Sequence, residues 1–227
     1  DHAGNGITVK DIHDRLFPAL QTLSAKCWTG AATSFSFEDF NRLRLALSEA
    51  PAVNEAARWQ KGKQLRIETL NPGQTTGEKE VGYGYRVEFT IEGADEPKGT
   101  VLFSSDNATF YLADPESGQL GFAHEGYLNK FNYRVEKGKK VTLAITGDNR
   151  KTCLYVDGKL REELGPITLY AMQQKDLATF QKSDATAWQP VVYNPSAKMH
   201  YQRTLVFPLQ KAGDFKSRIT GVKVSQK

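Results

Sequence analysis

The sequence has few of the residues that build disulfide frameworks and metal centres. Two cysteines and four histidines occur in 227 residues, with no Cys-x-x-Cys pair and no Cys/His cluster. A zinc site and any other metal or cofactor are therefore not expected. Cys27 falls in a helical pattern and Cys153 in a strand pattern. They could pair in an oxidising compartment, although two separate buried thiols are the commoner outcome.

A long hydrophobic run and a leader peptide are also missing. No apolar segment approaches the roughly 18 residues that a membrane span needs, and no signal peptide opens the chain. The first residues, DHAGNGITVKDIHDRLFPAL, look like the interior of a protein, so we expect a chain that begins within a longer one. The net charge of +4 comes from residues spread along the sequence. The sequence thus predicts neither a membrane span nor a nucleic-acid partner.

The usual motifs of nucleophilic and phosphate-binding sites are absent too. Ser104, Ser105 and His124 occur without a Gly-x-Ser-x-Gly elbow. The Gly-Tyr-Gly-Tyr stretch at 82–85 leads into a strand rather than a helix. No catalytic residue is therefore predicted from these patterns.

Two helices are predicted before residue 50. In DRLFPALQTLSAKCW, one helical face carries Leu16, Leu20, Leu23 and Cys27. Pro18 suits the first turn of that helix, where its missing N–H costs nothing, and Gly30 is a plausible stop.

The second predicted helix is SFEDFNRLRLALSEA. Ser36 is a good N-cap, with Asp39 three residues later, and Glu38 and Asp39 favour the positive end of the helix dipole. Pro51 follows its end. Its apolar stripe consists of Phe37, Phe40, Leu43 and Leu47.

After about residue 60, short β-branched and aromatic segments alternate with turn signals, and no helices lie between them. Asp157-Gly158 suits a two-residue hairpin, because both central residues need positive φ. This spacing predicts an antiparallel sandwich. Residues 172–202 are predicted to be a long polar connection. Strands are expected near 65–69, 83–92, 99–104, 107–112, 118–123, 126–135, 139–146, 151–156, 166–171, 203–209 and 215–225.

Alternation along these strands predicts which face is buried. Val141, Leu143 and Ile145 should share one face, and Leu154 should lie opposite Cys153. The aromatic stretch LGFAHEGYLNKFNYRV, residues 120–135, is then mainly a set of packing groups. The two helical stripes need a partner, and we expect them to pack on the sandwich and on each other.

Several stretches resemble concanavalin-like, or laminin-G-like, jelly-roll domains. They are DPESGQLGF, GKKVTLAITG, LYVDGK and the late TLVFPLQKAG…SRITGVKV. The resemblance covers roughly residues 65–227. It implies a mainly β protein: a concanavalin-like jelly-roll antiparallel β-sandwich over 59–227, preceded by a two-helix segment over 1–58.

The helical segment is similar to another family. DRLFPALQTLSAKCWTG resembles the last barrel helix of family 20 glycoside hydrolases, the exported β-N-acetylhexosaminidases, and FSFEDFNRLRLALSEAPAVN resembles the stretch that follows it. The resemblance implies an exported parent enzyme whose catalytic barrel is the partner of this chain. That family acts through an adjacent Asp-Glu pair. The only such pair here, Asp95-Glu96, lies in a Gly- and Pro-flanked turn, so this chain alone is expected to be inactive.

The function predicted is a non-catalytic accessory module that braces the barrel or aids glycan attachment. A free-standing carbohydrate-binding or adhesion module is the alternative, and a complete enzyme with an unusual site is a third. Aromatic rings stack on sugars, while amides and carboxylates bind hydroxyls. The same residues also have structural explanations. Trp188 could fill the end of the sandwich, and the stretch SSDNA around Asp106 suits a turn. A Ca²⁺ role for Asp106 or Asp148 has thin support. Candidate sugar-binding residues are Trp188, Tyr193, Asn194, Asp106, Asn107 and Tyr111.

Overall fold

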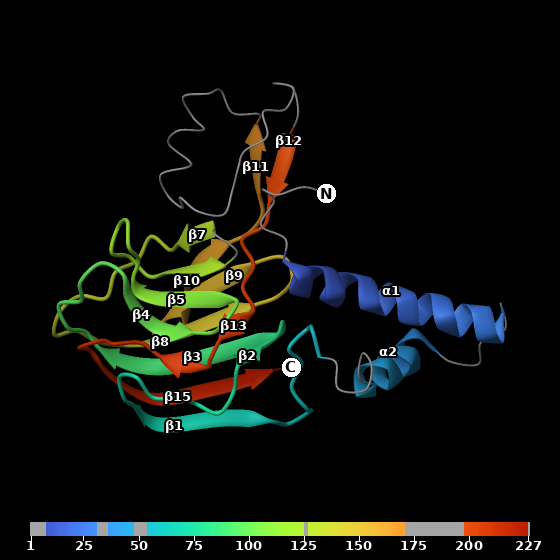
Figure 1. Ribbon diagram of the computed structural model, residues 1–227, viewed down its shortest axis with the longest axis horizontal. Helices are drawn as coiled ribbons and strands as arrows, with labels where there is room; N and C mark the ends of the chain where they lie inside the picture. The colour runs from blue at the N-terminus through green and yellow to red at the C-terminus, as the bar shows by residue number, and fades with distance from the viewer. Residues whose placement is uncertain (1–7, 31–35, 48–53, 125–126, 171–197, 227) are drawn as a thin grey trace.

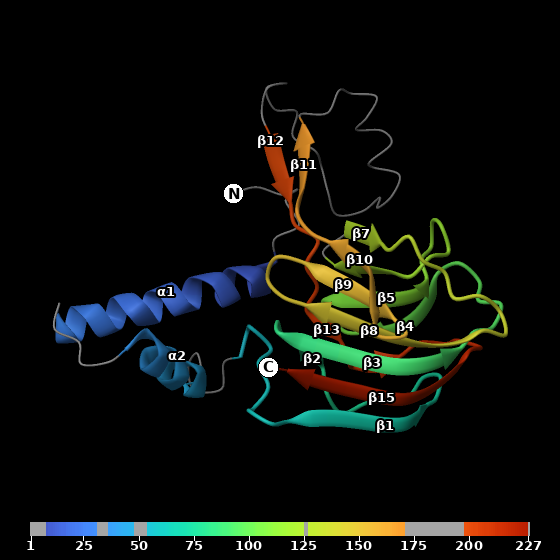
Figure 2. The same ribbon diagram turned by 180° about the vertical axis from the view of Figure 1, so that it is seen from behind.

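The computed structural model describes residues 8–30, 36–47, 54–124, 127–170 and 198–226. Two helices precede a β-rich body, and both lie to one side of it (Figure 1). The view from behind shows the same arrangement (Figure 2). None of the described helices is long and apolar enough to cross a membrane.

The first helix, α1 (Val9–Thr29), begins earlier than predicted. Thr8 and Asp11 form a capping box, in which Thr8 Oγ1 accepts from the Asp11 amide and the Asp11 side chain accepts from the Thr8 amide. This cap starts the helix, so Pro18 lies inside it and not in its first turn. The expectation for Pro18 was therefore wrong. Gly30 ends the helix as predicted, at φ 66°, and its amide donates to Lys26 O.

The second helix, α2 (Phe37–Ala46), has the predicted cap. Ser36 Oγ accepts from the Asp39 amide at 3.1 Å. Leu47 is its C-cap, and residues 48–53 lie outside the described part. Glu38 and Asp39 lie in its first turn, where the helix dipole favours acids.

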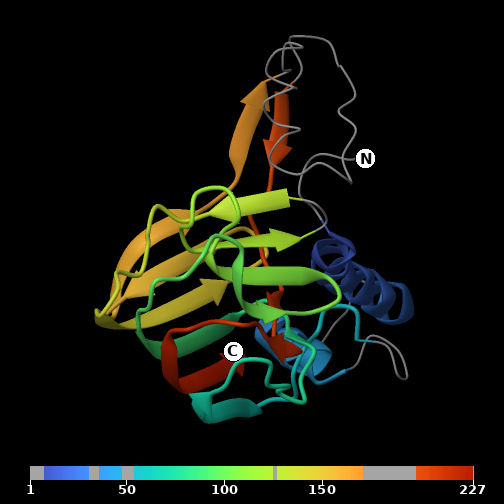
Figure 3. The same ribbon diagram turned by 60° about the vertical axis from the view of Figure 1, so that its left-hand side comes forward.

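Eleven strands of the described chain form two facing antiparallel sheets (Figure 3). The larger sheet has the order β1 (Gln64–Leu70), β15 (Arg218–Gln226), β3 (Tyr85–Glu92), β8 (Lys140–Gly147), β9 (Thr152–Val156) and β10 (Lys159–Leu164). The smaller has the order β14 (Lys211–Ala212), β4 (Thr100–Ser104), β5 (Ala108–Ala113), β6 (Gly121–His124) and β7 (Tyr127–Lys130). Two short pairs add β2 (Glu80–Val81) with β13 (Phe207–Pro208), and β11 (Ile167–Tyr170) with β12 (Lys198–Tyr201).

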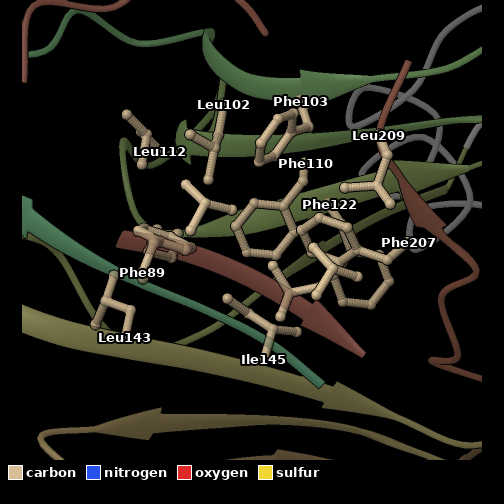
Figure 4. Close-up of a cluster of buried hydrophobic side chains, with 14 of the residues drawn as sticks. Phe89, Leu102, Phe103, Phe110, Leu112, Phe122, Leu143, Ile145, Phe207 and Leu209 are labelled. Carbon is tan, nitrogen blue, oxygen red and sulfur yellow. The ribbon is translucent and has the colours of Figure 1, made fainter. Parts of the chain in front are cut away.

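The space between the sheets is filled by aromatic and branched side chains (Figure 4). Phe207 packs against other rings of this core, with its ring centroid 5.1 Å from that of Phe110 and 5.7 Å from that of Tyr85. Leu143 and Ile145 of β8 are fully buried, and Leu154 of β9, which pairs with Ile145, is buried on the same face of the sheet. The predicted period-two burial is thus confirmed, and it fixes which face of each strand forms the core.

Several predicted strands differ in extent. The segment predicted over 126–135 forms β7 only over Tyr127–Lys130, because Phe131 then turns into the core. The segment over 203–209 supplies only the two residues of β13. The polar connection predicted over 172–202 contains β12 at its end, which pairs with β11.

The strand β10 was not predicted, although its hairpin was. Asp157 and Gly158 have φ values of 48° and 77°, as the two-residue turn requires. The sequence KLREEL is polar because β10 is an exposed edge strand of the larger sheet. Because β10 has no apolar face, the alternation of apolar and polar residues did not predict it.

The apolar stripe of α1 does not pack on the sandwich, which corrects the prediction. Leu16, Leu20 and Leu23 are 51%, 48% and 60% exposed. Only the first turns of α1 reach the sandwich, and they do so through polar side chains, because the rest of the helix projects outward (Figures 1 and 2). The two helices do contact each other, where Gln21 Nε2 donates to Arg44 O at 3.4 Å. Phe37, Leu43 and Leu47 are also exposed.

The two cysteines are free thiols. Cys27 is exposed on α1, whereas Cys153 is buried on β9, facing away from the core. Burial raises the pKa of the Cys153 thiol, and the nearby Glu163 carboxylate raises it further. Cys153 is therefore a packing residue rather than a reactive one.

Candidate functional site

A buried carboxylate joins α1 to the sandwich. Asp11 is fully enclosed. Besides capping its own helix, it accepts hydrogen bonds from the hydroxyls of Tyr83 and Thr204, the latter at 3.0 Å. Burial and the Asp11 carboxylate raise the pKa of Tyr83, so the phenol remains a donor. This junction holds the start of α1 against the loop before β3.

Beside this junction lies a cavity of about 480 Å³. It is bounded by the first turn of α1, the segment 54–59, the approach to β2 and the β4–β5 turn. Because these segments and Gln210 come from five separate parts of the sequence, only the folded chain assembles the cavity. Its lining consists of Lys10, Asn54, Glu55, Ala57, Arg58, Trp59, Lys63, Gly77, Glu78, Lys79, Glu80, Ser105, Asp106, Asn107 and Gln210.

Glu80 is the centre of the polar network in this cavity. Its Oε2 lies 2.8 Å from Lys10 Nζ of α1. Its Oε1 accepts from Ser105 Oγ at 3.0 Å and from Asn107 Nδ2 at 2.7 Å. A single buried carboxylate thus fixes the helix and the β4–β5 turn relative to each other.

Trp59 forms one wall of the cavity. Its indole Nε1 donates to Glu80 O at 2.9 Å, and its amide donates to Gln226 Oε1 of β15 at 2.6 Å. Lys63 Nζ lies 5.0 Å above the ring, in cation–π geometry, and 2.7 Å from Glu78 Oε1. The orientation of the Trp59 ring is therefore fixed by these two hydrogen bonds and by the Lys63 ammonium on one face of the ring.

The segment 54–59 is held in an unusual backbone conformation. Ala57 has φ 51°, a left-handed conformation that costs a non-glycine residue free energy. Gly82 approaches it so closely that an added Cβ would lie 1.9 Å from Ala56 O. The Gly82 amide donates to Ala57 O at 2.7 Å. Strain of this kind persists where the surrounding structure enforces it, and it often marks a functional site.

Two of the predicted sugar-binding residues lie in this cavity. Asp106 is exposed in the lining and makes no ion pair or hydrogen bond with any described residue. Asn107 uses its Nδ2 for Glu80, which leaves its carbonyl oxygen without a described partner. Together they present unpaired oxygen acceptors at the β4–β5 turn.

The other predicted residues lie elsewhere. Tyr111 is on the outer face of β5, opposite the buried Phe110 and Leu112, and it is not part of the cavity lining. Trp188, Tyr193 and Asn194 lie outside the described residues.

Sequence reasoning missed Trp59, Lys10 and Glu80. The one signal in the sequence for Trp59 was its position at the expected boundary between the helical segment and the sandwich. Lys10 and Glu80 had no local signal, because the pairing between them depends on how α1 meets β2.

The Asp95-Glu96 pair lies in the connection between β3 and β4, as its turn context predicted. Asp95 is exposed. Glu96 Oε1 accepts from the amides of Lys216 and Ser217, at 2.9 and 2.7 Å, and from Ser217 Oγ at 2.7 Å. The Glu96 carboxylate therefore ties two loops together.

The described part of the chain holds no group of three or more His, Cys, Asp or Glu that could ligate an ion. Asp148 Oδ1 accepts from the amides of Arg150 and Lys151, at 2.8 and 2.9 Å, which is ordinary turn chemistry.

The two facing sheets and the helices before them define the chain as a jelly-roll β-sandwich with a helical N-terminal segment. No known protein family matches its sequence, and no curated protein does either. No narrower assignment follows from sequence comparison.

Solved structures with a similar arrangement are distant. The Caenorhabditis elegans galectin LEC-6 is 10% identical, with a TM-score of 0.40 over 71% of this chain and 96% of that one. Domain 4 of AbnA, a GH43 extracellular arabinanase from Geobacillus stearothermophilus solved with arabinotriose, is 12% identical, with a TM-score of 0.33 over 71% and 65%. Trypanosoma rangeli sialidase is 15% identical, with a TM-score of 0.30 over 63% of this chain and 20% of the sialidase. These likenesses are too weak to bear on function.

Proposed function

We propose that this chain is a non-catalytic accessory module of an exported β-N-acetylhexosaminidase-like glycoside hydrolase, and that it binds glycans in the cavity beside α1. One observation carries the glycan-binding role. The cavity of about 480 Å³ combines unpaired acceptors at Asp106 and Asn107 with an oriented indole at Trp59. Its volume lies within the range of roughly 300–1,000 Å³ of ligand pockets.

The chemistry of the lining suits a sugar. Carboxylate and amide oxygens accept hydrogen bonds from hydroxyls, and an indole supplies an apolar surface for the C–H groups of a sugar ring. The Glu80 carboxylate holds the Asn107 amide, and the Glu80 carbonyl and Lys63 orient the Trp59 indole, before a ligand arrives, which lowers the entropy cost of binding.

The non-catalytic assignment rests on Glu96. Its Oε1 already accepts three hydrogen bonds from Lys216 and Ser217. We expect no release of nitrophenol from a β-N-acetylglucosaminide by this chain, and turnover in a purified sample would contradict the assignment.

The glycan-binding role is tested by titrating the chain with an oligosaccharide panel while following tryptophan emission. We expect saturable, millimolar or tighter binding, with an emission change that Trp59→Phe abolishes. Trp28→Phe is the matched control, because Trp28 is 88% exposed on α1 and does not line the cavity. No binding to any member of the panel would refute the role.

A second role, bracing a catalytic domain, is favoured by the exposed apolar stripe of α1. Leu16, Leu20 and Leu23 point to solvent over a helix of 21 residues, and such a patch is typical of an interaction surface. The coding sequence upstream of Asp1 tests the parentage. A catalytic barrel with an Asp-Glu pair there supports the accessory module, and its absence supports a free-standing carbohydrate-binding module.

A further inference from the structure

The charges that line the cavity beside α1 cancel. The described lining holds four cationic side chains, Lys10, Arg58, Lys63 and Lys79, and four carboxylates, Glu55, Glu78, Glu80 and Asp106. A site built for an acidic ligand would show an excess of cations aimed at it. No such excess exists here.

Two of these cations already form ion pairs with carboxylates of the lining. Lys10 Nζ lies 2.8 Å from Glu80 Oε2, and it also donates to Glu55 O at 3.3 Å. Lys63 Nζ lies 2.7 Å from Glu78 Oε1. An anionic ligand that captured Lys10 would leave Glu80, 6% exposed at its side chain, as an uncompensated buried charge.

The remaining charges do not favour an anion either. Arg58 Nη2 lies 3.8 Å from Oδ1 of Asp14, a residue of α1 that does not line the cavity. Lys79 makes no ion pair with any described residue, but neither does Asp106 in the same cavity. The free carboxylate therefore offsets the free ammonium and repels an incoming negative charge.

A neutral, hydroxyl-rich ligand meets none of these costs. The Asp106 carboxylate can accept two hydroxyl hydrogen bonds, and charge-assisted bonds of this kind are stronger than neutral ones. The Asn107 carbonyl oxygen can accept a third.

We infer that this cavity selects neutral oligosaccharides over acidic ones, with Asp106 as the main hydroxyl acceptor. The inference rests on the proposed glycan-binding role and gives it a ligand class. It concerns recognition only and includes no covalent step.

The experiment is calorimetric titration of the whole chain with two matched sets of tetrasaccharides. The neutral set is N-acetylchitotetraose, cellotetraose and mannotetraose. The acidic set is hyaluronan tetrasaccharide and tetragalacturonic acid. We expect binding of at least one neutral member, at least tenfold tighter than any acidic member. Its dissociation constant should change less than about twofold between about 50 and 500 mM NaCl, because screening acts on charged partners.

Two variants of nearly unchanged shape sharpen the result. Asp106→Asn should weaken the neutral ligand about tenfold, because a charge-assisted acceptor becomes a neutral one. Lys223→Gln should leave it within about twofold, because it removes an exposed ammonium of β15 that does not line the cavity. Equal thermal unfolding of both variants and the parent chain shows that the fold is intact.

The two possible failures differ. Tighter binding of an acidic member, weakened by salt and lost in Lys79→Gln, would overturn the neutral selectivity while the glycan-binding role survives. An unchanged affinity of Asp106→Asn for a bound neutral member would overturn the role of that carboxylate. Binding of neither set would overturn the glycan-binding role itself.

Discussion

Asp11 of α1 accepts a hydrogen bond from the Tyr83 hydroxyl of the sandwich while it caps its own helix. Thr204 donates to the same carboxylate oxygen. The helix is therefore attached through polar side chains, with Asp11 enclosed in the junction and Lys10 paired with Glu80, rather than through the apolar stripe that its sequence suggests. The attachment involves only the first turns of α1, and a single substitution at Asp11 should weaken it.

Asp11→Ala should loosen α1 from the sandwich. The change removes the capping box and leaves two hydroxyls without their acceptor, which together cost about 2–4 kcal/mol. Hydrogen exchange across residues 9–29 should accelerate, while β3 and β8 keep their protection. Asp39→Ala, which removes an exposed acid from the first turn of α2, is the control and should leave α1 exchange unchanged. Equal exchange in both variants would contradict the anchoring role.

His124 should make the protein less stable in mild acid. Burial lowers the pKa of this imidazole below its ordinary 6.5, against weaker opposing effects of the Asp11 carboxylate and the Thr204 backbone. The unfolded chain therefore takes up a proton at a higher pH than the folded chain, so the free energy of unfolding falls as pH drops below about 6.5. Between pH 7.5 and 5.0 the loss should reach at most about 2 kcal/mol for one group.

Urea unfolding at the two pH values measures this loss. His124→Phe retains an aromatic ring beside Phe122 but does not titrate. Its stability should vary less with pH than that of the parent chain. An identical pH dependence in both would exclude His124 as the source.

Gly82→Ala should disturb the cavity. A Cβ there would lie 1.9 Å from Ala56 O and 2.9 Å from Ala57 O. The segment 54–59 would have to move, at a cost of about 1–3 kcal/mol, and would take Trp59 with it. Both the affinity for glycans and the free energy of unfolding should therefore decrease in Gly82→Ala. Gly165→Ala is the matched control, because a Cβ there meets nothing within 4 Å.

Leu16→Ser with Leu20→Ser should change the surface but not the fold. Both side chains are about half exposed, so the isolated chain should lose less than about 1 kcal/mol of stability. Binding of a hydrophobic dye, and any self-association, should decrease. A loss of several kcal/mol would mean that the stripe is buried in solution.

The sequence predicted the sandwich because its strands alternate with period two. Leu143, Ile145 and Leu154 lie where that alternation puts them, and Asp157-Gly158 turns as its two residues require. Helix caps were equally local signals at Ser36 and Gly30. These features depend on neighbours in sequence, which is why pattern alone recovers them.

The cavity itself was not predicted from the sequence. Asp106 and Asn107, which line it, were named as candidate sugar-binding residues because amides and carboxylates in a turn suggest hydroxyl binding, and that role stays a prediction. Lys10 and Glu80 could not be paired in advance, since they are far apart in sequence and meet only through the attachment of α1. The placement of the helical stripe failed for a related reason. Amphipathicity says that a face needs cover, but not that a polar anchor such as Asp11 will decide the docking geometry.

The polar hairpin strand β10 also has a consequence for how the protein behaves at high concentration. It ends the larger sheet with the sequence KLREEL, whose charged side chains meet the solvent. A second molecule that tried to extend the sheet here would have to pair with a strand rich in exposed charges, and charged edge strands are one device by which native sheets avoid edge-to-edge association. This border should therefore resist fibril growth, and replacing its charges with valine or threonine would remove that protection.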